Sequence, residues 1–114
     1  MRVTILASGS SGNVILLQAA ETSVLIDIGL TAKRIHGHLA EQGVEANSLA
    51  GVLLTHEHGD HTKGLRVFCT KNSVPVFTNP LTADSLKRSG VSANWNLFGS
   101  GAEFQLGNLS VLPF

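Results

Sequence analysis

Residues 51–61 of this 114-residue chain read GVLLTHEHGDH, and this stretch decides how the rest of the sequence is interpreted. Gly51 to Thr55 is an apolar run of strand length, which is typical of a buried strand. Three histidines and two carboxylates follow it within six residues, from His56 to His61. Because alternate residues of an extended chain point to the same side, His56 and His58 can bind one ion together.

Asp60 and His61 follow Gly59, which permits a sharp turn, and we expect both in the first turn of a helix. Their adjacent side chains diverge, so they cannot join His56 and His58 around one small ion without strain. Two neighbouring metal ions therefore fit this spacing better than one. Imidazole and carboxylate ligands favour Zn²⁺ first, with Mn²⁺ or Fe as alternatives.

The segments around the motif predict a mixed sheet with flanking helices, in the α/β (α+β) class. Short connections imply that the first strands pair antiparallel. The glycine-rich turn at 8–13 is expected to be a tight hairpin turn, with contact to a site as the alternative. The expected strands are 2–8, 14–18, 24–28, 51–55, 74–77 and a hairpin at 104–111. The expected helices run from Thr31 to about Gln42, from near Asp60, and from Asn79 to Gly90.

The composition bounds the class of protein. Hydrophobic residues make up 43% of the chain and charged residues 14%, which is enough to form a core. Eight Lys and Arg balance eight Asp and Glu, which excludes a broadly basic nucleic-acid-binding surface but not a local positive groove. The single cysteine, Cys69, excludes a disulfide framework. No apolar run has the length of a membrane span or a signal peptide, so we expect a cytoplasmic protein without membrane association.

Residues 54–61, LTHEHGDH, resemble the metal-binding signature of the metallo-β-lactamase-fold hydrolases. Ile26-Asp27-Ile28-Gly29 is similar to an earlier strand end of that family that carries an aspartate. The turn at 8–13 and the run to Lys63-Gly64-Leu65 resemble the YycJ-like bacterial branch. The resemblance covers nearly the whole chain and implies half of an αββα sandwich, with residues 1–114 as the N-terminal part of one domain.

The resemblance also implies roles for the motif residues. His56 and His58 would bind the first metal, and Asp60 and His61 the second. Asp27 would orient the ligand loop through hydrogen bonds. A metal-bridging hydroxide would attack the substrate, and Asp60 would also act catalytically by orienting or deprotonating it. The branch implies phosphodiester hydrolysis by a DNA exonuclease, while an ester, thioester or lactam substrate stays open and no substrate-binding residue is assigned.

One departure from the family pattern changes what is expected of this chain. Family members add a His, a bridging Asp and a last His downstream, whereas the last histidine here is His61. We therefore expect a chain truncated at its C-terminal side, which binds metal weakly, is inactive alone and needs the missing half of the domain as its partner. The alternative is a non-catalytic half-domain that binds metal or a protein partner, and the sequence does not set the oligomeric state.

Four other residues receive less specific interpretations. His36 and His38 are two apart on a predicted helix, so they cannot chelate together and are expected to face solvent. Cys69 is expected to be a small core residue. Glu57 is expected to be a solvated spacer within the motif.

Overall fold

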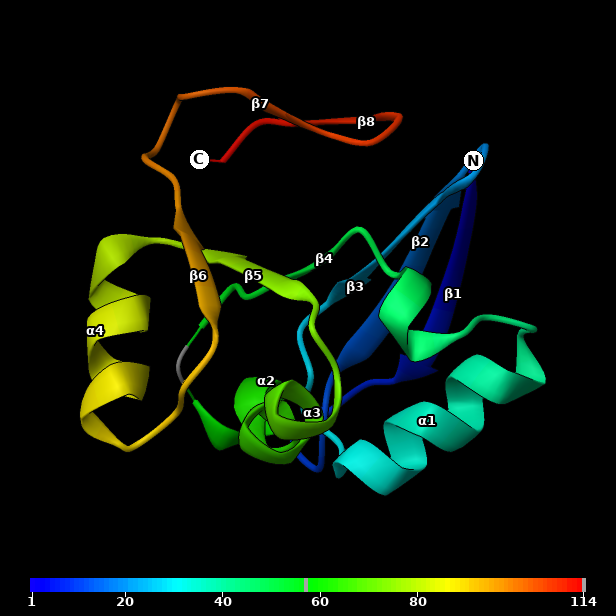
Figure 1. The fold of residues 1–114 in the computed structure, drawn as a ribbon, viewed down its shortest axis with the longest axis horizontal. Helices are drawn as coiled ribbons and strands as arrows, with labels where there is room; N and C mark the ends of the chain where they lie inside the picture. The colour runs from blue at the N-terminus through cyan, green and yellow to red at the C-terminus, as the bar shows by residue number, and fades with distance from the viewer. Residues whose placement is uncertain (57, 114) are drawn as a thin grey trace.

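A computed structural model describes residues 1–56 and 58–113; Glu57 and Phe114 lie outside the described residues, as does the expectation for Glu57. Six strands form one sheet in the order β1-β2-β3-β4-β5-β6, and two more form a separate hairpin (Figure 1). The sheet strands are β1 (Arg2–Ala7), β2 (Val14–Ala19), β3 (Thr22–Ile26), β4 (Gly51–Leu53), β5 (Pro75–Thr78) and β6 (Asn94–Leu97). The hairpin strands are β7 (Phe104–Leu106) and β8 (Leu109–Val111).

The sheet changes from antiparallel to parallel at β3. β1, β2 and β3 form an antiparallel meander, because the turns between them are too short for a crossover. From β3 to β6 the neighbouring strands are parallel, and a helical segment separates each pair in the sequence. Parallel neighbours end at the same edge, so the residues that follow β3, β4 and β5 are brought together there.

The helices cover one face of this sheet (Figure 1). They are α1 (Ala32–Glu41), α2 (Gly59–Thr62), α3 (Leu65–Lys71), α4 (Pro80–Arg88) and the short 3₁₀ helix η1 (Ala46–Ser48). Ile35 of α1 and Phe68 of α3 are completely buried, and they belong to the same core as Leu25, Val52 and Val76 of the sheet. The N-caps expected at Thr31 and Asn79 are present, since their side chains accept hydrogen bonds from Arg34 N and Thr82 N.

The hairpin β7–β8 covers part of the opposite face of the sheet (Figure 1). Leu106 and Leu109 form a second apolar cluster with Val24 of β3. Val3 and Ile5 of β1 lie on the same side of the sheet but are 58% and 65% exposed. The described residues therefore bury the centre of one face and leave part of the other open.

The mixed sheet with flanking helices, the antiparallel start and the hairpin at 104–111 are confirmed. The single helix expected from near Asp60 is wrong, because α2 and α3 are separate around Gly64. A Cβ on Gly64 would meet the Leu30 carbonyl oxygen, and Gly64 N donates to Ile28 O at 2.9 Å, so the backbone is fixed there by neighbouring chain.

Strand β6 and the position of His36 were not predicted. β6 contains two asparagines, which have low strand propensity, and its pairing with β5 overrides that preference. His36 is only partly exposed: its ring stacks on Phe68 with centroids 5.5 Å apart, and its Nε2 lies 2.9 Å from Asn72 Nδ2. His38 lies separately, with Nδ1 3.9 Å from Glu41 Oε1, so the two histidines do not chelate together.

The packing of α4 provides a test of the fold. Leu86 is 6% exposed and belongs to the main core, whereas Leu81 on the same helix is 85% exposed. Leu86→Ala should lower the free energy of unfolding by about 2–5 kcal/mol, because it opens a cavity under the helix. The matched change Leu81→Ala should alter it by less than about 0.5 kcal/mol. Urea unfolding measures both, and equal effects would contradict this packing of α4.

Candidate metal centre

The histidine motif lies where two neighbouring parallel strands end. Asp27 follows β3, and Thr55 and His56 follow β4. The Asp27 amide donates to the Leu53 carbonyl oxygen at 2.7 Å, which extends the pairing of the two strands by one hydrogen bond. Ligands of open α/β sheets bind at this carboxyl edge, so the position itself favours a functional site.

Asp27 is a buried carboxylate at the base of the motif. It is 5% exposed, and its Oδ1 accepts a hydrogen bond from Thr55 N at 2.8 Å. Its Oδ2 accepts from Thr55 Oγ1 at 2.7 Å and lies 2.6 Å from His61 Nδ1. A buried carboxylate without such partners would be strongly destabilising. Asp27 therefore ties the end of β4 to the side chain of His61.

The backbone of Asp27 is in the left-handed region, with φ of 64°. Aspartate is among the few non-glycine residues that adopt this conformation. The bend places its carboxylate under the motif while Ile28 N donates to His61 O at 2.7 Å. The backbone after β3 thus holds the start of α2 from below.

Asn13, at the end of the glycine-rich turn, holds the other side of α2. Its backbone N donates to Asp60 O at 2.8 Å, and its Nδ2 lies 3.2 Å from Asp60 Oδ2. The turn connects β1 and β2 as a hairpin, as predicted, and it also borders the motif. Sequence reasoning did not assign Asn13 or Thr55 to the site. Contact of the turn at 8–13 with a site was predicted only as an alternative, and Asn13 makes that contact with the motif.

Gly29 is required for this approach. A Cβ on Gly29 would meet the Asp60 carbonyl oxygen, and it would also lie 2.5 Å from Asn13 N. The segment IDIG at 26–29 thus supplies a carboxylate, a bend and a close backbone contact in four residues.

The motif side chains cluster above this base. The ring centroids of His56 and His61 are 4.8 Å apart, and those of His56 and His58 are 5.9 Å apart. His61 Nε2 lies 3.4 Å from Asp60 Oδ2. His56 and His58 are exposed, while the carboxylate of Asp60 and the ring of His61 are partly covered.

The donor set suits zinc in chemistry, and one pair also suits it in spacing. Two ligands bound tetrahedrally to Zn²⁺ are about 3.3 Å apart, given bonds of about 2.0–2.1 Å. The pair formed by His61 Nε2 and Asp60 Oδ2 has this separation. The expectation that these adjacent side chains diverge is therefore wrong, because the turn at the start of α2 brings their polar ends together. Within 1–56 and 58–113, however, no three His, Cys, Asp or Glu side chains are arranged to hold one ion jointly. The assignment of two ions to the motif therefore stays a prediction.

A cavity of about 620 Å³ opens beside His56. It lies between the ends of β3 to β5 and the segments before and after the hairpin. Its lining is mostly apolar, formed by Ile26, Leu53, Leu54, Phe98, Val111, Leu112 and Pro113, with Thr55, His56, Asn79 and Ser100 as polar members. A substrate group next to the motif would enter this space.

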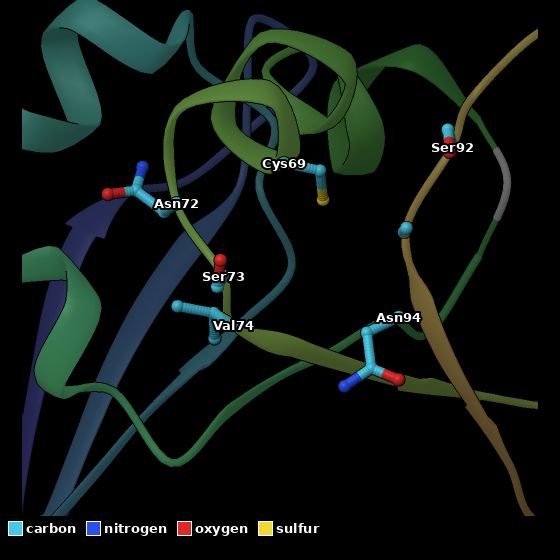
Figure 2. Close-up of a pocket in the computed structure, with 7 residues that line it drawn as sticks. Cys69, Asn72, Ser73, Val74, Ser92 and Asn94 are labelled. Carbon is cyan, nitrogen blue, oxygen red and sulfur yellow. The ribbon is translucent and has the colours of Figure 1, made fainter.

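A second, smaller pocket of about 260 Å³ lies away from the motif (Figure 2). It is lined by residues that precede β5 and β6, so it is at the opposite edge of the parallel strands from His56. The Cys69 side chain points into it from α3 (Figure 2) and packs partly against the main core. Burial raises the pKa of the Cys69 thiol to about 11, which disfavours a nucleophilic role.

The buried network predicts that Asp27→Asn is costly. The amide cannot accept both bonds that the Asp27 Oδ2 atom accepts, while asparagine tolerates the same backbone conformation. The free energy of unfolding should fall by about 1–3 kcal/mol in urea titrations. Asp84→Asn, in an exposed pair with Arg88 on α4, should change it by less than about 0.5 kcal/mol. A cost for Asp27→Asn as small as that of the control would contradict the network.

The raised pKa predicts slow alkylation of Cys69. The thiolate is the reactive form, so a pKa of about 11 leaves less of it at pH 8 than an ordinary thiol has. In the folded chain the iodoacetamide rate should keep rising as the pH increases towards 11, and in urea it should level off at lower pH. Mass spectrometry measures the rate, and the same profile in both states would contradict the effect of burial.

Comparison with known proteins identifies the family of this chain. The sequence model of the metallo-beta-lactamase superfamily matches residues 7–110. The chain is 36% identical over 87 residues to Exodeoxyribonuclease YycJ of Bacillus anthracis, which is 76% of this chain and 33% of that protein. It is 32% identical over 118 residues to Exodeoxyribonuclease WalJ of Streptococcus pneumoniae serotype 2, which is 99% of this chain and 44% of that protein.

Solved structures show the same fold. A motif mutant of a metallo-beta-lactamase from Cronobacter sakazakii matches with a TM-score of 0.80 at 19% identity, over 95% of this chain and 48% of the other. The metallo-beta-lactamase SMB-1 matches with a TM-score of 0.76 at 20% identity, over 89% and 45% of the two chains. The chain thus spans less than half the length of each of these proteins. Since the family model matches most of its residues and the fold agrees, this chain belongs to the metallo-beta-lactamase superfamily.

Proposed function

We propose that residues 1–114 carry the N-terminal part of a metal-dependent hydrolase, with two divalent ions, zinc first, at the motif. In this proposal His56 and His58 bind one ion, and Asp60 and His61 bind the other. The observation that carries it is the pair of His61 Nε2 and Asp60 Oδ2, 3.4 Å apart. Asp27 holds His61 at its other ring nitrogen, and Asn13 Nδ2 donates to the same Asp60 oxygen at 3.2 Å.

In this proposal the bound ions, Asp60 and Asp27 have different roles. Bound divalent ions would supply a Lewis acid that activates water and polarises the scissile group. Asp60 is the proposed catalytic carboxylate, because it is partly exposed and can orient the attacking water and accept its proton. Asp27 is buried below and keeps the imidazole of His61 turned towards the site.

The proposed substrate is the phosphodiester backbone of DNA, cleaved from an end. The relatives that share 32–36% identity are named exodeoxyribonucleases, and two-metal sites suit phosphodiester displacement. A bacterial DNA substrate would place the activity in the cytoplasm. The β-lactamases are similar in fold alone, at 18–22% identity.

The proposed partner of these residues is the rest of the domain. The open apolar face at Val3 and Ile5 is suited to cover by further chain, and the motif needs further ligands to enclose an ion. A second candidate, a non-catalytic half-domain, is favoured by the same incomplete arrangement. The two candidates differ in activity, so they can be separated by assay of the complete protein, meaning the natural gene product that contains residues 1–114.

Across the described residues, none of the helices combines the length and the apolar character that a membrane span needs.

His58→Ala in the complete protein tests the ligand assignment. Its bound metal, measured by elemental mass spectrometry, should fall. Its rate of DNA hydrolysis should drop by at least about 100-fold, which is more than is expected when a residue that only contacts a metal ligand is replaced. His38→Ala removes an imidazole beside Glu41 on α1 and should leave both unchanged. Full metal content and activity in His58→Ala would show that the assignment is wrong.

The form of the DNA tests the exonuclease proposal. The complete protein should shorten linear DNA from its ends and leave closed circular DNA intact, because an exonuclease needs an end. The 114-residue chain alone should do neither. Cleavage of the circle would indicate an endonuclease, and a complete protein that binds metal but cleaves neither DNA would favour the non-catalytic half-domain.

A further inference from the structure

Thr55 lies between the buried carboxylate and the first histidine of the motif. Its Oγ1 is 2.7 Å from Asp27 Oδ2 and 2.9 Å from His56 Nδ1. A threonine hydroxyl carries one proton and accepts with its lone pairs. The direction in which the hydroxyl donates that proton therefore decides which nitrogen of the neutral His56 ring carries the hydrogen.

The Thr55 hydroxyl donates its hydrogen bond to the carboxylate of Asp27. Asp27 Oδ2 can only accept, so Thr55 Oγ1 must donate to it. The Thr55 oxygen then has only lone pairs left for His56, and His56 Nδ1 must donate its own N–H. A neutral ring protonated at Nδ1 has its free lone pair on Nε2.

His61 reaches the same form directly. Its Nδ1 is 2.6 Å from Asp27 Oδ2, compared with 3.4 Å from Thr55 Oγ1, so the carboxylate is its main acceptor. His61 Nδ1 therefore also donates, and its Nε2 faces Asp60 Oδ2 at 3.4 Å. One carboxylate thus controls two imidazoles, one of them through a hydroxyl.

We propose that Thr55 is a positioning residue that carries the influence of Asp27 to His56 and fixes His56 in the Nδ1–H form, with Nε2 free to bind metal. This inference rests on the proposed metal site for its purpose, but the tautomer itself is a property of the metal-free chain. The backbone N–H of Thr55 also donates to Asp27 Oδ1, so removal of the hydroxyl leaves one anchor between these residues in place.

The test is the ¹⁵N shifts of the histidine rings in the metal-free 114-residue chain, at a pH of about 8.5, where ordinary imidazole is neutral. His56 should be protonated at Nδ1 in the original chain and in Thr55→Ser. In Thr55→Val it should move towards the Nε2–H form that unconstrained histidine favours. Thr70→Val, which removes a remote hydroxyl that donates to Arg66 O, should leave His56 unchanged. Thr55→Ala is a second hydroxyl-free variant if the valine chain does not fold.

Zinc affinity gives an independent readout. Thr55→Val should weaken zinc binding about tenfold, as loss of a ligand-orienting partner does, and Thr55→Ser should stay within about twofold of the original chain. An unchanged His56 tautomer in a folded hydroxyl-free variant would overturn the role of Thr55, even if zinc binds. A tautomer that changes as expected in a protein that binds no metal, even as the complete gene product, would support the role of Thr55 and overturn the proposed metal site.

Discussion

The site depends on one buried carboxylate. Asp27 accepts hydrogen bonds from the backbone and hydroxyl of Thr55 and from the ring of His61. These bonds link the ends of β3 and β4 to the first turn of α2, three segments that are separated in the sequence. Because Asp27 is only 5% exposed, its carboxylate depends on these hydrogen bonds in place of water, and it in turn fixes the positions of its partners.

The fold supplies the setting for that carboxylate. The parallel register of β3 and β4 brings residues 27 and 55 to the same edge, and the helices that make the parallel crossovers bury the apolar face behind it. The backbone then adds constraints that no side chain could supply: the bend at Asp27 and the close contact of Gly29 with Asp60. His56 and His58 are exposed to solvent, while the carboxylate of Asp27 that orients the site is buried.

Much of this was predictable from the sequence, for identifiable reasons. The apolar run before His56, the caps at Thr31 and Asn79 and the Gly107-Asn108 turn are local signals, and each predicted element is present. β6 and the contact of His36 with Phe68 were missed because they depend on partners far away in the sequence, β5 and Phe68 itself. The break between α2 and α3 was missed because its cause, the contact of Gly64 with Leu30, is also tertiary.

Some residues of the site could likewise be predicted from the sequence, and others could not. The motif residues and Asp27 could be chosen by residue type and spacing. Asn13 and Thr55 could not, since an amide in a turn and a threonine at a strand end are common, and only the fold brings them to Asp60, Asp27 and His56. How the ions are shared among the four motif residues is still a prediction, because no three of their described donors enclose a single ion.

The central claim is that His56, His58, Asp60 and His61 form a two-ion centre over Asp27. The most direct measurement is anomalous diffraction at the zinc edge from crystals of the complete protein grown with zinc. The account predicts two peaks, each about 2.0–2.2 Å from nitrogen or oxygen atoms of these side chains, with Nε2 of His56 and His61 among them. Zinc bound elsewhere, for example at His36 or His38, with the motif empty at saturating metal, would contradict it.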